Sequence, residues 1–94
     1  MRQVLEWFAE EMEKKLQEND HKAHWSEADG DYLISRMEQE MDELMKAMID
    51  VQFGNGDPIQ VIKEAADVAN FAMMIADNMR EDQPKDRGCS GVSK

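Results

Sequence analysis

A turn segment near the middle of the chain constrains the fold more than any other feature. It spans residues 53–58 and reads Phe-Gly-Asn-Gly-Asp-Pro. The two glycines are typical of a helix end, and Asp57 followed by Pro58 is typical of a helix start, as N-cap and first helical residue. Apolar residues recur at helical spacing on both sides. Before the turn they form an apolar stripe of Leu33, Met37, Met41, Leu44 and Met48. The segment therefore predicts two antiparallel neighbouring helices joined by a short turn.

Helical periodicity predicts three helices along the chain, and we find no strand pattern. The first covers residues 2–18, the second begins at Asp29 or Asp31 and ends near Phe53, and the third runs from Pro58 to about Arg80. Residues 19–29 are expected to form a loop. We expect a single all-α domain over residues 1–82, an antiparallel bundle of about three helices. Residues 83–94 are polar, contain proline and glycine, and are expected to be a disordered tail.

The third helix carries an unusually broad apolar face that is rich in alanine. A chain of 94 residues buries only about 60–65% of its extended surface on folding, so a second subunit is a natural source of further burial. We therefore expect the bundle to be completed by homo-oligomerisation, as a homodimer or a homotetramer.

Charge narrows the range of partners. The chain has 11 Lys and Arg against 21 Asp and Glu, a net charge of −10. Such an acidic surface disfavours direct binding to nucleic acid or to an anionic membrane. The single cysteine, Cys89, has no partner within the chain, and the N-terminal residues have no long apolar run. We expect a cytoplasmic protein without a signal peptide or a membrane span.

Two acidic pairs flank the turn, and each pair has a spacing of i,i+3. Glu40 and Glu43 precede it, and Glu64 and Asp67 follow it. Each pair lies on one side of its helix, at the border of the apolar face, and antiparallel packing would bring the pairs together. Two such charges ~4 Å apart repel by ~4 kcal/mol at a dielectric of ~20, which a bound cation would relieve. Oxygen ligands favour Mg²⁺, with Mn²⁺ as a substitute; a solvated acidic surface is the alternative.

These residues resemble the Glu-Glu-x-x-Glu and Glu-x-x-Asp motifs of the MazG-like all-α NTP pyrophosphatases, which are related to dimeric dUTPases. The stretch from Gln39 to Ala47 matches the first motif, and Glu64-Ala65-Ala66-Asp67 matches the second. The resemblance covers about residues 25–80. It implies that Glu40, Glu43, Glu64 and Asp67 bind Mg²⁺ and that a nucleoside triphosphate is hydrolysed to the monophosphate and pyrophosphate, in nucleotide-pool control or house-cleaning.

The chain departs from the family pattern at one position, because Gln39 stands where the first glutamate of the motif is expected. Gln39 cannot act as a base, so the general base stays unassigned, and Glu43 is a candidate for that second role. Lys46, one turn after Glu43, is a candidate for contact with a phosphate during catalysis. Lys63, immediately before Glu64, is a second candidate phosphate ligand. For both lysines the alternative is an exposed, salt-bridging side chain.

Four further residues are candidates for binding the base or sugar of a nucleotide. Trp25 precedes the second helix and would stack on a base, as aromatic residues near this helix entrance do in the family, or cap the bundle. Phe71 shares the stripe of Glu64 and Asp67, and would pack in the core or contact the base. Asn70 and Asn78 carry amides that would bind a base or sugar.

Two other functions are alternatives to the pyrophosphatase. One is a non-catalytic acidic helical interaction module whose partner surface is the alanine-rich face; Gln39 in place of glutamate favours such a degenerate site. The other is a phosphoribosyl-ATP pyrophosphatase, with related chemistry on a different substrate.

Overall fold

The computed structural model describes residues 1–18 and 25–81, and every secondary-structure element within them is a helix. The elements are α1 (Gln3–Glu18), the short 3₁₀ helix η1 (Trp25–Glu27), α2 (Gly30–Gln52) and α3 (Pro58–Glu81). The all-α fold with three α-helices is therefore confirmed. No helix in these ranges is long and apolar enough to cross a membrane. The expected tail 83–94 and its Cys89 lie outside the described residues, as does most of the expected loop.

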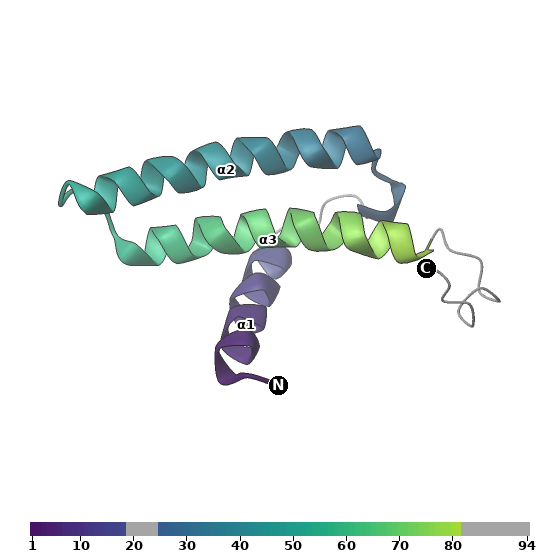
Figure 1. Ribbon diagram of the computed structural model, residues 1–94, viewed down its shortest axis with the longest axis horizontal. Helices are drawn as coiled ribbons and strands as arrows, with labels where there is room; N and C mark the ends of the chain where they lie inside the picture. Colours follow the sequence, from purple (N-terminus) through teal and green to yellow (C-terminus); the bar gives the residue numbers. More distant parts are fainter. Residues whose placement is uncertain (19–24, 82–94) are drawn as a thin grey trace.

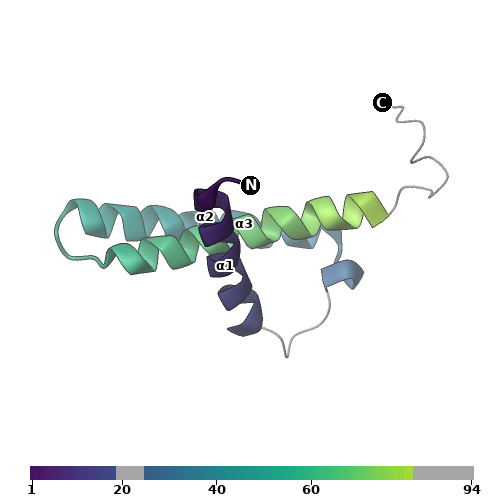
Figure 2. The same cartoon turned by 90° about the horizontal axis from the view of Figure 1, so that it is seen from below.

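The helices α2 and α3 lie side by side over most of their length and form the body of the molecule (Figure 1). The turn that joins them lies at one end of the pair, and η1 packs on α3 at the other end. Helix α1 packs against α3 near its middle and projects from it at a steep angle, which Figure 2 shows from below. Every other described element thus packs against α3.

Local sequence explains why α2 ends and α3 begins where they do. Gly54 has a φ of 83°, a conformation that glycine adopts without strain. Its N–H donates to the carbonyl of Val51, and the N–H of Asn55 donates to the carbonyl of Asp50, which is the Schellman arrangement at a helix end. A carboxylate oxygen of Asp57 accepts a bond from the N–H of Ile59 at 3.0 Å. The predicted cap of α3 is therefore confirmed.

The face of α2 that meets α3 differs from the apolar stripe expected from the sequence. Leu33 and Ala47 are its buried positions, whereas Met41 and Met48, both members of the expected stripe, are exposed. Half-buried positions continue the buried line at helical spacing, namely Met37, Glu40, Leu44 and Val51. The helix is thus rotated so that Glu40 faces α3, and an apolar strip faces away from it.

Candidate metal centre

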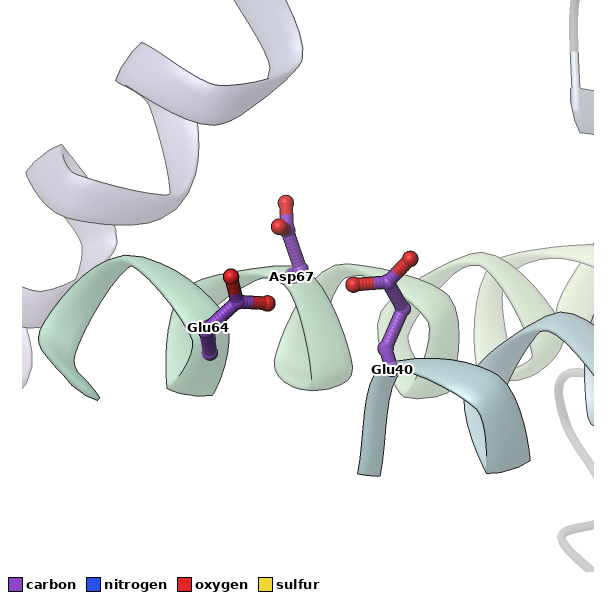
Figure 3. A group of neighbouring side chains, drawn as sticks. All are labelled: Glu40, Glu64 and Asp67. Carbon is purple, nitrogen blue, oxygen red and sulfur yellow. The ribbon is translucent and has the colours of Figure 1, made fainter. Parts of the chain in front are cut away.

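Three of the four predicted metal ligands converge between α2 and α3. One carboxylate oxygen from each of Glu40, Glu64 and Asp67 lies within 4.8 Å of one oxygen of the other two. Glu40 reaches the group from α2, and the other two side chains extend from neighbouring turns of α3 (Figure 3). All three residues are half-buried; the side chains of Glu40 and Asp67 are 15% and 19% exposed. We call these residues the acidic triad.

The positions of the triad residues follow from helix geometry and from the packing of α2. Glu64 and Asp67 are three residues apart on α3, so they lie on one face. Glu40 lies on the inner face of α2, between Met37 and Leu44, which are also half-buried. The side-by-side packing of the two helices then brings the carboxylates together.

The surroundings of Asp67 oppose its ionisation. Burial is the largest cause that raises the pKa of Asp67 above its ordinary value, and the negative charges of Glu40 and Glu64 raise it further. The ammonium of Lys15, on α1, acts in the opposite direction and lowers the pKa of Asp67, but does not outweigh burial. The triad therefore holds negative charge at a free-energy cost that a cation would reduce.

Two basic side chains lie beside the triad, and neither was a predicted site residue. Lys15 Nζ is 3.5 Å from a carboxylate oxygen of Asp67 and 3.0 Å from one of Glu18. The guanidinium of Arg36 lies 3.1 Å from a carboxylate oxygen of Glu40. Arg36 stands one turn before Glu40, so its helical spacing was a usable signal. The Lys15 contact joins α1 to α3, and no local pattern indicates it.

The fourth predicted ligand and the two predicted phosphate-binding lysines occupy more open positions. Glu43, Lys46 and Lys63 are all exposed on their helices. Glu43 lies one turn after Glu40 but is not a member of the acidic triad. The roles of these three residues stay predictions.

The predicted base-binding and sugar-binding residues make contacts that join elements. Asn70 is only 3% exposed, and its side-chain N–H donates to the carbonyl of Met12 on α1 at 3.0 Å. The side-chain N–H of Asn78 donates to the carbonyl of Trp25 at 3.1 Å. The indole N–H of Trp25 donates to Asp77 at 3.0 Å. These bonds anchor α1 and η1 on α3.

A cavity of about 230 Å³ lies where η1 and α2 meet the C-terminal part of α3. It is lined by Ser26, Ala28, Gly30, Leu33, Ile75, Asn78 and Met79. Ile75 follows Asp67 by eight residues, which is ~12 Å along an α-helix. Of the predicted base-binding and sugar-binding residues, Asn78 is the one that lines this cavity. Phe71 instead lies under Arg36, whose guanidinium carbon is 5.3 Å from the ring centroid.

The donor set of the acidic triad fits a hard divalent cation. All three donors are carboxylate oxygens, which Mg²⁺ and Mn²⁺ prefer over softer ligands. Around an octahedral Mg²⁺, oxygens on opposite sides lie about 4.2 Å apart and neighbouring oxygens about 3 Å apart, as the usual Mg–O distance requires. The triad oxygens, which lie up to 4.8 Å apart, would therefore move closer together to hold the ion.

Comparisons of the chain with protein-family models, with curated proteins and with solved structures find no match.

Proposed function

We propose that the protein is a cytoplasmic, Mg²⁺-dependent nucleoside triphosphate pyrophosphohydrolase that acts in nucleotide-pool control or house-cleaning. The observation that supports this function best is the convergence of Glu40, Glu64 and Asp67 from two helices at half-buried positions. Three carboxylates held this close favour a bound cation, and such a cation allows an acidic surface to accept a triphosphate. The resemblance of the two motifs to MazG-like enzymes supports the same proposal.

In the proposed reaction, a water oxygen forms a bond to the α-phosphorus and the bond from that phosphorus to the bridging α–β oxygen breaks. The products are a nucleoside monophosphate and pyrophosphate. Mg²⁺, held by the acidic triad and by Glu43, would supply charge neutralisation at the phosphates and lower the pKa of a bound water. Glu43 is the proposed acceptor of the water proton, and Lys46 the proposed partner of the leaving pyrophosphate.

The proposed enzyme is an antiparallel helical bundle completed by a second copy of the chain or by further copies. An exposed apolar strip on α2 supports this assembly. Met45 is 59% exposed, and Ile34, Met41 and Met48 are also exposed. Burying such a strip removes apolar area from water at about 25 cal/mol per Å². Light scattering should give a mass above that of one chain, and Met45→Lys should lower it; a monomer at all concentrations would contradict the assembly.

The activity test is a panel of ribo- and deoxyribonucleoside triphosphates with Mg²⁺, read by release of pyrophosphate. Wild-type protein should release pyrophosphate from at least one of them, and Glu64→Gln should abolish release without loss of helical circular dichroism. Glu38→Gln is the matched control because Glu38 is an exposed α2 residue outside the triad. No release from any nucleotide at micromolar protein would disprove the proposed enzyme.

A non-catalytic interaction module is the second candidate, and the exposed strip on α2 favours it too. This candidate predicts a heterologous partner, no pyrophosphate release and no response to Mg²⁺. The midpoint of thermal unfolding separates the two candidates: millimolar Mg²⁺ should raise it in the enzyme, because the ion binds only the folded triad. An unchanged midpoint would favour the interaction module.

A further inference from the structure

Arg36 is fixed beside the acidic triad by three different contacts. Its guanidinium donates to the side-chain oxygen of Gln39 and to a carboxylate oxygen of Glu40, the latter at 3.1 Å. It also lies over the ring of Phe71 on α3, at 5.3 Å from the centroid. Cation–π stacking and a planar fork of donors hold a guanidinium in one orientation. Arg36 is therefore oriented by both helices that supply the triad.

The guanidinium retains capacity for a ligand. Arginine has five N–H donors, and over the described residues the bonds to Gln39 and Glu40 use two of them. Its side chain is 31% exposed, so solvent, or a ligand from solvent, reaches it. Arginine binds phosphate oxygens through paired, charge-assisted N–H bonds. Arg36 therefore offers donors suited to phosphate beside the triad.

Charge balance shows what these cations add. The triad carries three negative charges when ionised, and a divalent ion alone would leave it net negative. Lys15 pairs with Asp67 and Arg36 pairs with Glu40, although Lys15 also bonds Glu18. Arg36 and a divalent ion would each add positive charge beside the triad and so reduce the repulsion of a polyanion. Without Arg36, the metal-loaded triad would repel a polyphosphate more strongly.

From this geometry we infer that Arg36 is a phosphate-binding residue of the centre, which contacts the polyphosphate of the substrate when the triad holds its metal. The inference rests on the proposed function and deepens it, because it names a residue that holds the polyphosphate. Gln39 acts as a positioning residue, since its side-chain oxygen accepts a bond from the guanidinium. A neutral amide orients Arg36 without adding another negative charge beside the phosphates. This gives a role to the residue that departs from the family motif.

The test measures binding by isothermal titration calorimetry with the full chain. Inorganic tripolyphosphate premixed with excess Mg²⁺ is titrated into Mg²⁺-saturated protein, and Mg²⁺ alone is titrated separately. Arg36→Gln should weaken tripolyphosphate binding about tenfold or more, because it removes paired charge-assisted bonds. Arg36→Lys keeps the charge but loses the fork, so its affinity should be intermediate. Mg²⁺ affinity should be equal or higher in Arg36→Gln, since Glu40 is released from its ion pair.

Arg2→Gln is the matched control, because it makes the same chemical change at an exposed position on the N-terminal side of α1. It should leave tripolyphosphate affinity within about twofold of wild type, as expected for a remote screened charge. Circular dichroism checks folding, and Arg36→Lys supplies the result if Arg36→Gln does not fold. Unchanged tripolyphosphate affinity in the folded Arg36 variants would overturn the role of Arg36 while leaving the proposed enzyme standing. If the wild-type protein binds no Mg²⁺, both the role of Arg36 and the proposed enzyme are overturned.

Discussion

The ammonium of Lys15 lies 3.5 Å from a carboxylate oxygen of Asp67, and this ion pair links α1 to the acidic triad. The same ammonium bonds Glu18 at 3.0 Å. Burial lowers the pKa of Lys15. The hydrogen bonds and the negative charges of Glu18 and Asp67 outweigh burial, so the pKa lies above the ordinary value. Lys15 therefore stays protonated beside Asp67, where a divalent ion would also bind.

Lys15→Met should tighten the binding of divalent cations. The proposed ion and the ammonium would compete for Asp67, and methionine keeps much of the apolar stem while removing the charge. Loss of a partly buried pair worth roughly 1 kcal/mol corresponds to about fivefold in affinity. Titration calorimetry with Mn²⁺ measures the change. Lys14→Met is the control, because Lys14 pairs with Glu11 away from the triad. Equal Mn²⁺ affinities in the wild type and in both variants would show that Lys15 and the metal do not compete.

Asn70→Ala should destabilise the fold by about 0.5–1.5 kcal/mol, the usual net contribution of one hydrogen bond. Its side chain holds α1 to α3 through the carbonyl of Met12, a contact between residues 58 positions apart. The free energy of unfolding in urea measures the loss. Gln17→Ala, which removes an exposed bond to Glu13 within α1, should cost much less. Similar losses in both variants would contradict the anchoring role of Asn70.

Two glycine substitutions should have different effects on stability. A Cβ on Gly56 would lie 2.8 Å from the Cβ of Asp50 and from the backbone nitrogen of Val51. Gly56→Ala should therefore cost about 1–3 kcal/mol, as overpacking usually does. A Cβ on Gly30 would meet no described atom within 4 Å, so Gly30→Ala should be neutral or stabilise by up to about 1 kcal/mol. Chemical denaturation of both variants measures the contrast, and equal effects would contradict the close approach at the turn.

The contact between η1 and α3 should weaken in acid. Hydrogen bonds from Arg80 and from Trp25 hold the pKa of Asp77 below its ordinary value of 3.8. A carboxyl group with a lowered pKa stabilises the folded state above its unfolded-state pKa, and this stabilisation is lost as the pH falls through the folded-state pKa. The NMR shift of the Trp25 indole N–H should therefore titrate with a midpoint below 3.8. Asp77→Asn should remove this titration. A titration midpoint at or above 3.8 in the wild-type protein would contradict the lowered pKa of Asp77.

The boundaries of the helices around the turn could be predicted from the sequence, because they depend on local conformational preferences. Gly54 and Asp57 act within a few residues of themselves, and α2 and α3 end and begin at that turn as expected. The beginning of α2 was also predicted to within a residue. Asp29 stands at the N-cap of α2, but its side chain makes no capping hydrogen bond.

The prediction of the buried face of α2 was less accurate. Periodicity identifies a wide apolar face but does not say which part of that face packs against α3. Met41 and Met48 belong to that stripe and are exposed, whereas Glu40 at its edge is half-buried. The inner face is decided by the fit of α2 onto α3. That fit also separates Glu40 from Glu43, because residues three apart differ by about 60° around an α-helix.

Local sequence is enough to specify the spacing of the carboxylates on each helix and the turn that joins α2 to α3. Both are local properties, fixed by 3.6 residues per turn and by glycine, aspartate and proline at the turn. Which carboxylates converge, and which cations lie beside them, depends instead on how the helices pack. Lys15 reaches Asp67 because α1 packs across the middle of α3, held there by Asn70. Such a contact depends on the packing of helices far apart in the chain, which no local pattern encodes.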